Sequence, residues 1–334
     1  MKYTAIIPAA GAGTRLKPLT HTIPKPMVHV AGKPIIGHIL DKMIGAVDTV
    51  VIVVGYMKDK LIDYVEKNYS DKFNLNFVEQ KEQLGLGHSI WVTKDVILNS
   101  PVLIVLGDEI FERSYKELLN LCKNKEYAGS IGVKEVDNPS LYGIIELNED
   151  GSIKKLIEKP EEPESNLAAA GVYIINNSKI LFESLEEVVN TKGGHGGEYQ
   201  LTDALQIMVD KGAKIDTFKI SKWYDCGRPE MLLRVNKILL KNSCRMNGET
   251  ENCVIINPVI IEEGCKIKDS VIGPFVSMAP CSRVVNSIIK NSIIGMGSEI
   301  VEVLLRDSIV GAEAKVFGKG QRLYVGENAE IDMR

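Results

Sequence analysis

The sequence predicts an α/β domain built on a mostly parallel, Rossmann-like sheet, followed by a smaller domain of short repeated strands. Strand-like and helix-like patterns alternate through the first two-thirds of the chain, as in sheets whose crossover connections are helices. From about Asn252 the pattern changes to a short repeat of aliphatic residues and turns. A chain of 334 residues is long enough for two domains. We place them at residues 1–242 and 243–334.

The first elements of the sheet domain follow from apolar patterns. Ala5 to Pro8 is a short apolar run that predicts a first strand. Apolar residues then recur at helical spacing from Ile35 to Ile44, which predicts a helix. Thr49 to Val54 and Val102 to Leu106 are continuous apolar runs, typical of strands buried on both faces. Because ligands gather at the carboxyl ends of such strands, the loops there are the candidate site.

The loop after the first strand has the composition of a phosphate-binding loop. Gly11 and Gly13 let backbone N–H groups approach a ligand and form an anion-binding nest. Arg15 and Lys25 add two cations, which suits a polyanion such as a nucleoside triphosphate. A dinucleotide fingerprint is disfavoured because it needs a third glycine where Leu16 stands. The chain also lacks the Gly-Lys-Ser/Thr ending of a P-loop.

Bulk composition favours a cytoplasmic enzyme and disfavours two other classes. The net charge is -4, and no dense Lys/Arg run appears, so we expect no nucleic-acid partner. No apolar stretch approaches the ~20 residues needed to span a bilayer, so we expect no membrane partner. None of the six cysteines forms a Cys-x-x-Cys pair, which indicates scattered reduced thiols.

The pattern Gly-x-Gly-Thr-Arg-Leu from Gly11, followed by Lys25-Pro26, resembles the signature of the sugar-1-phosphate nucleotidyltransferases. The resemblance runs from about Tyr3 to about Arg234 and is strongest to the glucose-1-phosphate thymidylyl- and uridylyltransferases. It implies a Mg²⁺-dependent reaction in which a sugar 1-phosphate, expected to be glucose 1-phosphate, and a nucleoside triphosphate give a nucleotide sugar and pyrophosphate.

The resemblance also implies the catalytic residues. Arg15 would contact the departing β- and γ-phosphates, and Lys25 the α-phosphate. Asp108 and Asp225 would hold Mg²⁺, while Lys159 would bind the incoming sugar phosphate. The sugar phosphate attacks the α-phosphorus in line with the leaving group, so catalysis is mainly positioning and charge neutralisation.

The nucleotide and sugar subsites follow from the same resemblance. Gln80 and Gly85 have the spacing of the family's pyrimidine-reading loop, and an amide can both donate to and accept from uracil or thymine. UTP and dTTP differ by one methyl group, worth ~1 kcal/mol, and the motifs match neither subfamily throughout. Both nucleotides therefore remain possible substrates.

The other nucleotide-binding residues are Ala10, Gly11, Gly13 and Thr14. The expected sugar-binding residues are Tyr142, Gly143, Glu158, Gly171 and Glu198. Asp203 is expected to cap a helix from Ala204 to Val209.

The C-terminal repeat resembles the hexapeptide left-handed β-helix, joined by a helix near Met231 to Leu240. Its aliphatic-glycine pairs begin at Ile272, Ile294, Val310 and Val325, and the first interval is wider than the other two. Many such β-helices are acyltransferases, but those enzymes usually need a histidine in the solenoid, and all five histidines here precede residue 196. We therefore expect an assembly domain and a homo-oligomer. A catalytically silent sensor of nucleotide sugars is a third possibility, disfavoured by the intact set of cations and carboxylates.

Overall fold

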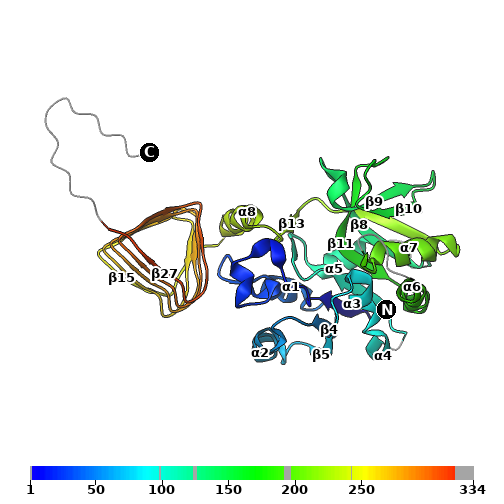
Figure 1. Cartoon of the computed structure of the whole chain (residues 1–334), viewed down its shortest axis with the longest axis horizontal. Helices are drawn as coiled ribbons and strands as arrows, with labels where there is room; N and C mark the ends of the chain where they lie inside the picture. The colour runs from blue at the N-terminus through cyan, green and yellow to red at the C-terminus, as the bar shows by residue number, and fades with distance from the viewer. Residues whose placement is uncertain (1, 98, 123–125, 192–196, 242, 320–334) are drawn as a thin grey trace. The chain divides into compact units, whose positions relative to one another are not determined.

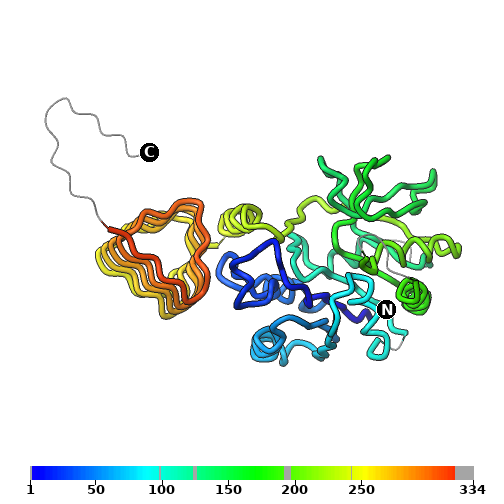
Figure 2. The backbone as a smooth tube through the Cα atoms, in the orientation of Figure 1, coloured from blue at the N-terminus to red at the C-terminus, as the bar shows by residue number. Residues whose placement is uncertain are grey.

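The computed structural model describes residues 2–97, 99–122, 126–191, 197–241 and 243–319 (Figure 1, Figure 2). Two compact units divide the chain: Met1–Val28 with Lys33–Leu232, and His29–Gly32 with Leu233–Arg334. The predicted fold class is confirmed, with a Rossmann-like sheet domain followed by a left-handed parallel β-helix. No helix within the described ranges is long and apolar enough to cross a membrane.

The first unit is built on a mixed sheet with the order β10-β9-β11-β6-β1-β4-β5 among the described residues, and β8 and β12 extend it from β11. The neighbours β6, β1, β4 and β5 are all parallel, while β11 runs antiparallel to β6, β8 and β9. The parallel part carries the predicted phosphate loop at its carboxyl edge. The strands are β1 (Thr4–Pro8), β4 (Thr49–Val54), β5 (Asn74–Glu79), β6 (Val102–Val105), β8 (Gly129–Glu135), β9 (Gly143–Leu147), β10 (Ile153–Glu158), β11 (Leu167–Ile175) and β12 (Ile215–Lys219).

Helices cover the sheet with their apolar faces. Leu181, Leu185, Leu205 and Met208 from two of these helices pack into one core with Ile104 of β6. The helices of this unit are α1 (Ile35–Met43), α2 (Lys58–Tyr69), α3 (Leu86–Trp91), α4 (Lys94–Ile97), α5 (Tyr115–Leu121), α6 (Ser178–Asn190) and α7 (Leu201–Asp210). Helix α8 (Pro229–Leu240) links to the second unit, and β2 (His29–Val30) pairs with β3 (Lys33–Pro34).

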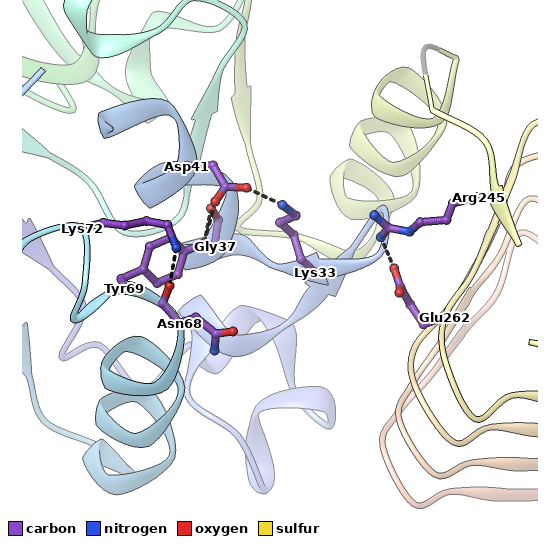
Figure 3. A network of polar contacts seen from close by, with 8 residues as sticks. All are labelled: Lys33, Gly37, Asp41, Asn68, Tyr69, Lys72, Arg245 and Glu262. Atoms are coloured by element: carbon purple, nitrogen blue, oxygen red, sulfur yellow. Dashed lines mark hydrogen bonds and ion pairs between the residues drawn. The ribbon is translucent and has the colours of Figure 1, made fainter. Parts of the chain in front are cut away.

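A polar network ties α1 to α2 (Figure 3). The Tyr69 hydroxyl donates to the Gly37 carbonyl oxygen at 3.0 Å and to Asp41 Oδ1 at 2.8 Å. Lys33 forms an ion pair with the same Asp41 carboxylate. Gly37 is required here, because a Cβ atom would lie 2.5 Å from the Tyr64 hydroxyl oxygen. The network therefore holds α1 against α2. In the chain, α1 follows shortly after the segment that carries Lys25.

The second unit is a triangular coil of short parallel strands, seen in cross-section in Figures 1 and 2. Val254 pairs with Val271, Val271 with Ile288, and Ile288 with Leu304, so successive coils are of nearly equal length and the last is slightly shorter. Aliphatic side chains from all three faces fill the interior. The strands are β14 (Arg245–Met246), β15 (Glu249–Glu251), β16 (Val254–Ile255), β17 (Val259–Ile261), β18 (Lys266–Lys268), β19 (Val271–Ile272), β20 (Val276–Met278), β21 (Arg283–Val285), β22 (Ile288–Lys290), β23 (Ile293–Ile294), β24 (Glu299–Val301), β25 (Leu304–Arg306), β26 (Ile309–Val310) and β27 (Lys315–Phe317).

The predicted repeat pairs do not all mark the same position in the coil. Ile294 and Val310 are neighbours on one face, in successive coils. Ile272 lies on a different face, in β19, where it pairs with Ile289. The wide interval from Ile272 to Ile294 therefore joins two faces rather than two equivalent positions. Val325 lies outside the described residues.

His29 makes the stability of the fold dependent on pH. Burial lowers the pKa of His29 to about 4, and its Nδ1 is buried without a hydrogen-bond partner. The unfolded state therefore binds an extra proton below about pH 6.5, and stability is lost as the pH falls from there towards 4. We expect this residue to contribute about 3 kcal/mol to that loss. Urea unfolding of the wild type and His29→Gln at pH 7 and pH 4 measures it, and an equal loss in both proteins would contradict it.

Candidate functional site

A cleft of about 540 Å³ opens at the carboxyl edge of the parallel strands, within the first unit. Loops after β1, β5, β6 and β10 line it, together with the segment before α7. Most of the residues predicted to bind substrates line this cleft. They are Ala10, Gly11, Gly13, Thr14, Arg15, Lys25, Gln80, Gly85, Asp108, Glu158, Lys159 and Glu198.

The loop after β1 is shaped by Gly13. Its φ of 61° is in the left-handed region, and a Cβ atom would lie 2.9 Å from Lys25 Cβ and from Thr20 Cγ2. The Thr20 hydroxyl donates to the Gly13 carbonyl oxygen at 2.8 Å and holds the turn. A short 3-10 helix, Thr14–Leu16, follows and presents the exposed Arg15. Glycine is therefore needed here to bring the loop against the segment that carries Lys25.

Lys25 and Asp108 form an ion pair at the cleft. Lys25 begins a 3-10 helix, Lys25–Met27, and Asp108 follows β6 after Leu106 and Gly107. Their side chains are 14% and 26% exposed, so the pair is partly desolvated while remaining open to a ligand. The arrangement places one cation and one anion where the strand ends, and each charge holds the other in position.

Asp225 reaches the same place from far along the chain. Strand β13 (Trp223–Asp225) pairs antiparallel with β7 (Glu109–Phe111), with Asp225 opposite Glu109. The Cys226 N–H donates to the Asp108 carbonyl oxygen at 2.9 Å, which joins the two segments. Asp225 Oδ1 accepts from the Gly227 N–H at 2.6 Å, and Gly227 lines the cleft. The pairing of β7 with β13 therefore brings Asp225 near Asp108, although only Asp108 of these two predicted metal-binding residues lines the cleft.

The donor set fits a magnesium ion bound together with substrate. No group of three potential metal ligands occurs among the described residues. Mg²⁺ commonly uses one or two carboxylates and completes its shell with water and substrate phosphates. Asp108 lines the cleft with the glycine loop, and Asp225 lies on the strand paired with the one that follows Asp108, so the two could supply such carboxylates.

Glu109 is a functional candidate that sequence reasoning missed. Its side chain is buried beneath the cleft, and its Oε2 has no hydrogen-bond partner. Burial raises the pKa of Glu109 well above its usual range, and the charges of Asp108 and Asp225 raise it further. The acidic residue directly after Asp108 was the available signal, but its burial depends on β13 and β11. The buried Glu109 carboxyl group therefore lies next to Asp108 and Asp225.

Gly171 has a different surrounding from the one expected. It does not line the cleft; it lies inside β11, where the register against β8 slips between Ala169 and Tyr173. Its φ is 62°, and a Cβ atom would lie 1.7 Å from Glu109 Oε2. The space beside Gly171, which was expected to bind sugar, is thus filled by the Glu109 carboxyl group.

Glu158 and Lys159 line the part of the cleft next to α7. Glu158 ends β10, and its Oε2 accepts from the Thr202 hydroxyl at 3.3 Å. Lys159 Nζ lies 3.3 Å from Glu158 Oε1 and remains half exposed. The Lys159 N–H donates to the Tyr142 carbonyl oxygen at 3.0 Å. The carboxylate is therefore held in place, and the ammonium group is accessible to an anion.

Tyr142 and Gly143 lie beside Glu158 and Lys159 but do not line the cleft. The Tyr142 ring packs edge-on against Trp223, with 5.3 Å between centroids, and burial raises the pKa of its hydroxyl. A Cβ atom on Gly143 would lie 2.8 Å from Thr202 Cγ2 and 3.2 Å from Glu158 Oε2. In the free protein, Gly143 therefore allows Thr202 and Glu158 to approach.

Gln80, predicted to read the base, lines the cleft. This side chain is 5% exposed, and its Nε2 donates to the Gly85 carbonyl oxygen at 3.1 Å. Its Nε2 also lies 3.1 Å from His88 Nδ1, and the His88 ring stacks on Trp91. These contacts orient the Gln80 amide before any ligand binds. Gln83 was missed, although its Nε2 donates to the Ala10 carbonyl oxygen at 3.1 Å and it lines the cleft.

The helix near Glu198 begins earlier than expected. Helix α7 starts at Leu201, with Gln200 at its N-cap, so Asp203 lies in the first turn and not at the cap. Gln200 is buried, and its Nε2 donates to Glu198 Oε2 at 3.2 Å. The start of α7 therefore orients Glu198 at the rim of the cleft.

A glycine loop, the Asp108 carboxylate and separated cations line one cleft, a set of groups suited to phosphoryl transfer. The family model described as nucleotidyl transferase matches residues 4–242. The chain belongs to this family, among the sugar-1-phosphate nucleotidyltransferases, which confirms the resemblance.

Three similar proteins illustrate the range within the family. The bifunctional protein GlmU of Methanococcus maripaludis is 41% identical over 268 residues, covering 79% of this chain and 61% of that protein. A glucose-1-phosphate thymidylyltransferase of Streptomyces antibioticus is 28% identical, with 99% of both chains covered. A UDP-glucose pyrophosphorylase complexed with UDP-glucose superposes with a TM-score of 0.65 at 32% identity, covering 73% of this chain and 100% of that one. The chain thus spans less than two-thirds of the length of the GlmU protein.

Proposed function

We propose that the protein condenses a pyrimidine nucleoside triphosphate, UTP or dTTP, with glucose 1-phosphate to give a nucleotide sugar and pyrophosphate. One observation carries the proposal: a single cleft is lined both by the Gly13 loop with the Lys25–Asp108 pair and by Glu158 with Lys159. A triphosphate and a sugar phosphate would therefore meet between them. The proposed catalytic residues all belong to the first unit.

Each residue has a role that its position allows. The backbone of Ala10 to Thr14 surrounds the phosphates, and the exposed Arg15 contacts the departing pyrophosphate. Lys25 turns from Asp108 to the α-phosphate, whose charge grows in the transition state. Lys159 leaves Glu158 to hold the attacking phosphate, while Glu158 and Glu198 accept hydrogen bonds from sugar hydroxyls. Attack in line with the leaving group needs only this positioning and charge compensation.

Asp108 and Asp225 would hold Mg²⁺ against the phosphates. A bound ion would supply positive charge that offsets the charge of the transition state. Glu109 supports Asp108 and Asp225 from below, because it occupies the buried space beside β11.

Pyrophosphate release with UTP, dTTP, ATP, GTP and CTP, each with Mg²⁺ and glucose 1-phosphate, tests the proposal. Release with UTP or dTTP is expected, and the ratio of their kcat/KM values defines the preferred nucleotide. N-acetylglucosamine 1-phosphate and galactose 1-phosphate are run in parallel, since GlmU proteins are among the relatives. Silence with every combination would overturn the proposal and favour a protein that only senses nucleotide sugar.

Replacing Gln80 with leucine is expected to weaken base recognition. Leucine has a similar volume but cannot exchange hydrogen bonds with the edge of uracil or thymine. We expect kcat/KM for the preferred triphosphate to fall roughly 10²-fold, since buried polar groups of the base lose their partner. Steady-state kinetics with the pyrimidine and purine triphosphates measure the change.

The matched control for Gln80 is Gln206→Leu, because this glutamine lies outside the cleft on α7. Its oxygen accepts from the Leu156 N–H, so the control also reports a lost glutamine hydrogen bond. An unchanged kcat/KM in Gln80→Leu would show that the base binds elsewhere.

A further inference from the structure

The polar contacts around Gln80 decide which of its two amide atoms a ligand can reach. Gln80 Nε2 lies 3.1 Å from the Gly85 carbonyl oxygen, which can only accept a hydrogen bond, so this end of the amide must be the nitrogen. The same nitrogen lies 3.1 Å from His88 Nδ1, and His88 Nδ1 must be the acceptor because an amide nitrogen only donates. These two contacts account for both hydrogens of the amide. Gln80 therefore has no hydrogen left to donate to a ligand.

The amide oxygen of Gln80 is the atom left for a ligand. Gln80 lines the cleft, and within the described ranges its Oε1 accepts no hydrogen bond. The residue as a whole is 5% exposed, but this oxygen is not sealed from solvent. A base that enters the cleft would therefore meet a hydrogen-bond acceptor at Gln80.

The His88 ring is held in the orientation that this arrangement needs. It stacks on Trp91, with 5.7 Å between centroids and 27° between planes, and it lies 6.3 Å from the Tyr199 ring. Trp91 Nε1 donates to Glu186 Oε2 at 2.7 Å, which anchors the stack to α6. Burial lowers the pKa of His88, despite the nearby Glu82, so the ring is neutral at pH 7. Its single proton then lies on Nε2, and Nδ1 accepts.

We propose that His88 is a positioning residue for base recognition, which makes Gln80 read the N3 position of a pyrimidine as a donor. This inference rests on the proposed function of the cleft. In uracil and thymine N3 carries a hydrogen, which can be donated to Gln80 Oε1. In cytosine N3 carries no hydrogen and is itself an acceptor, so two lone pairs would face each other. His88 does not line the cleft, so it favours UTP and dTTP over CTP through Gln80.

Removing the acceptor at position 88 is expected to release the amide. His88→Phe keeps a ring that can stack on Trp91 but offers nothing to the second hydrogen of Gln80. The amide then gains by turning that hydrogen toward the cleft, where it can be donated to cytosine N3. We expect the ratio of the inhibition constant of CTP to the KM of the preferred triphosphate to fall roughly tenfold, the size of one neutral hydrogen bond. The kcat should change little, because base contacts are alike in the ground state and the transition state.

His88→Asn separates the acceptor from the ring. Asparagine Oδ1 can take nearly the place of Nδ1 and accept from Gln80 Nε2, but it cannot stack on Trp91. We expect this variant to keep the selectivity of the wild type. A purely structural role of the ring predicts the reverse order, with His88→Phe selective and His88→Asn unselective. His21→Phe is the matched control and should keep the selectivity, because His21 is exposed and does not line the cleft.

A double variant tests whether His88 acts through Gln80. In Gln80→Leu there is no amide to orient, so adding His88→Phe should change the selectivity against CTP no further. Losses that add in the double variant would mean that His88 acts on the nucleotide by another route, and they would contradict the proposal.

Two measurements need no turnover. Nitrogen NMR of the full chain with labelled histidine reports the tautomer of the wild type, and a proton on Nε2 of His88 with none on Nδ1 is expected. Calorimetric titration with UTP and with CTP, without sugar phosphate, repeats the comparison of the variants as binding constants. A proton on Nδ1, or a His88→Phe protein as selective as the wild type, would overturn the proposal. A wild type that binds UTP but releases no pyrophosphate with any sugar phosphate would instead overturn the proposed reaction, and the binding constants would still decide the role of His88.

Discussion

Replacing Asp225 with asparagine is expected to lower kcat/KM by roughly a thousandfold, about 4 kcal/mol of transition-state stabilisation. Asparagine keeps the oxygen that accepts from the Gly227 N–H, so the local turn is preserved. It loses the negative charge that, with Asp108, would hold a divalent cation against the reacting phosphates. The initial rate of pyrophosphate release over a series of Mg²⁺ concentrations measures the loss. Lys25→Ala should produce a similar loss, because it removes the cation assigned to the α-phosphate.

A control separates this effect from general damage. Asp63→Asn makes the same chemical change on the exposed side of α2, outside the cleft. It should retain wild-type turnover, and all three variants should unfold at urea concentrations close to that of the wild type. Turnover within tenfold of the wild type in Asp225→Asn would refute the metal assignment. A loss that excess Mg²⁺ fully restores would show that the residue acts on cation affinity alone.

The elements of the fold that the sequence predicts correctly are determined by residues close together in the chain. The run from Thr49 to Val54 forms β4 at those bounds, since a fully buried parallel strand needs an unbroken apolar run. Helix α1 begins at Ile35 as its helical spacing predicts. The loop at Gly13 follows a strand, so its place at the carboxyl edge of the sheet could be foreseen.

The features of the fold and of the candidate site that the sequence could not predict depend on contacts between segments far apart in the chain. The apposition of Asp108 and Asp225 comes from the pairing of β7 with β13, which no local pattern encodes. The burial of Glu109 likewise needs β11 and β13 in place. In the β-helix, the aliphatic repeat indicates the kind of fold but not the face, because the coils are not all of one length.

Gly171→Ala is expected to destabilise the first unit strongly, by about 3 kcal/mol or more. The residue adopts a φ of 62°, which alone disfavours alanine by about 1 kcal/mol. The added methyl group would also lie 1.7 Å from Glu109 Oε2, so either the carboxyl group or β11 must move. Glu109 is buried and lies beside Asp108 and Asp225, which leaves little room for that movement. The free energy of unfolding from urea titration measures the effect.

Two further variants assign the destabilisation to this contact. Gly151→Ala is the matched control, because Gly151 has a φ of 81° but open space around its Cβ position, and it should lose only about 1 kcal/mol. Glu109→Ala removes the carboxyl group that the new methyl group would strike. In that background, Gly171→Ala should lose little more than the control does, and the difference is the coupling energy of the two positions. Equal losses with and without Glu109 would mean that backbone strain, and not the buried carboxyl group, requires glycine in β11. The turnover of the double variant then tests a second role of Glu109. A double variant that is stable but inactive would show that Glu109 also supports Asp108 and Asp225.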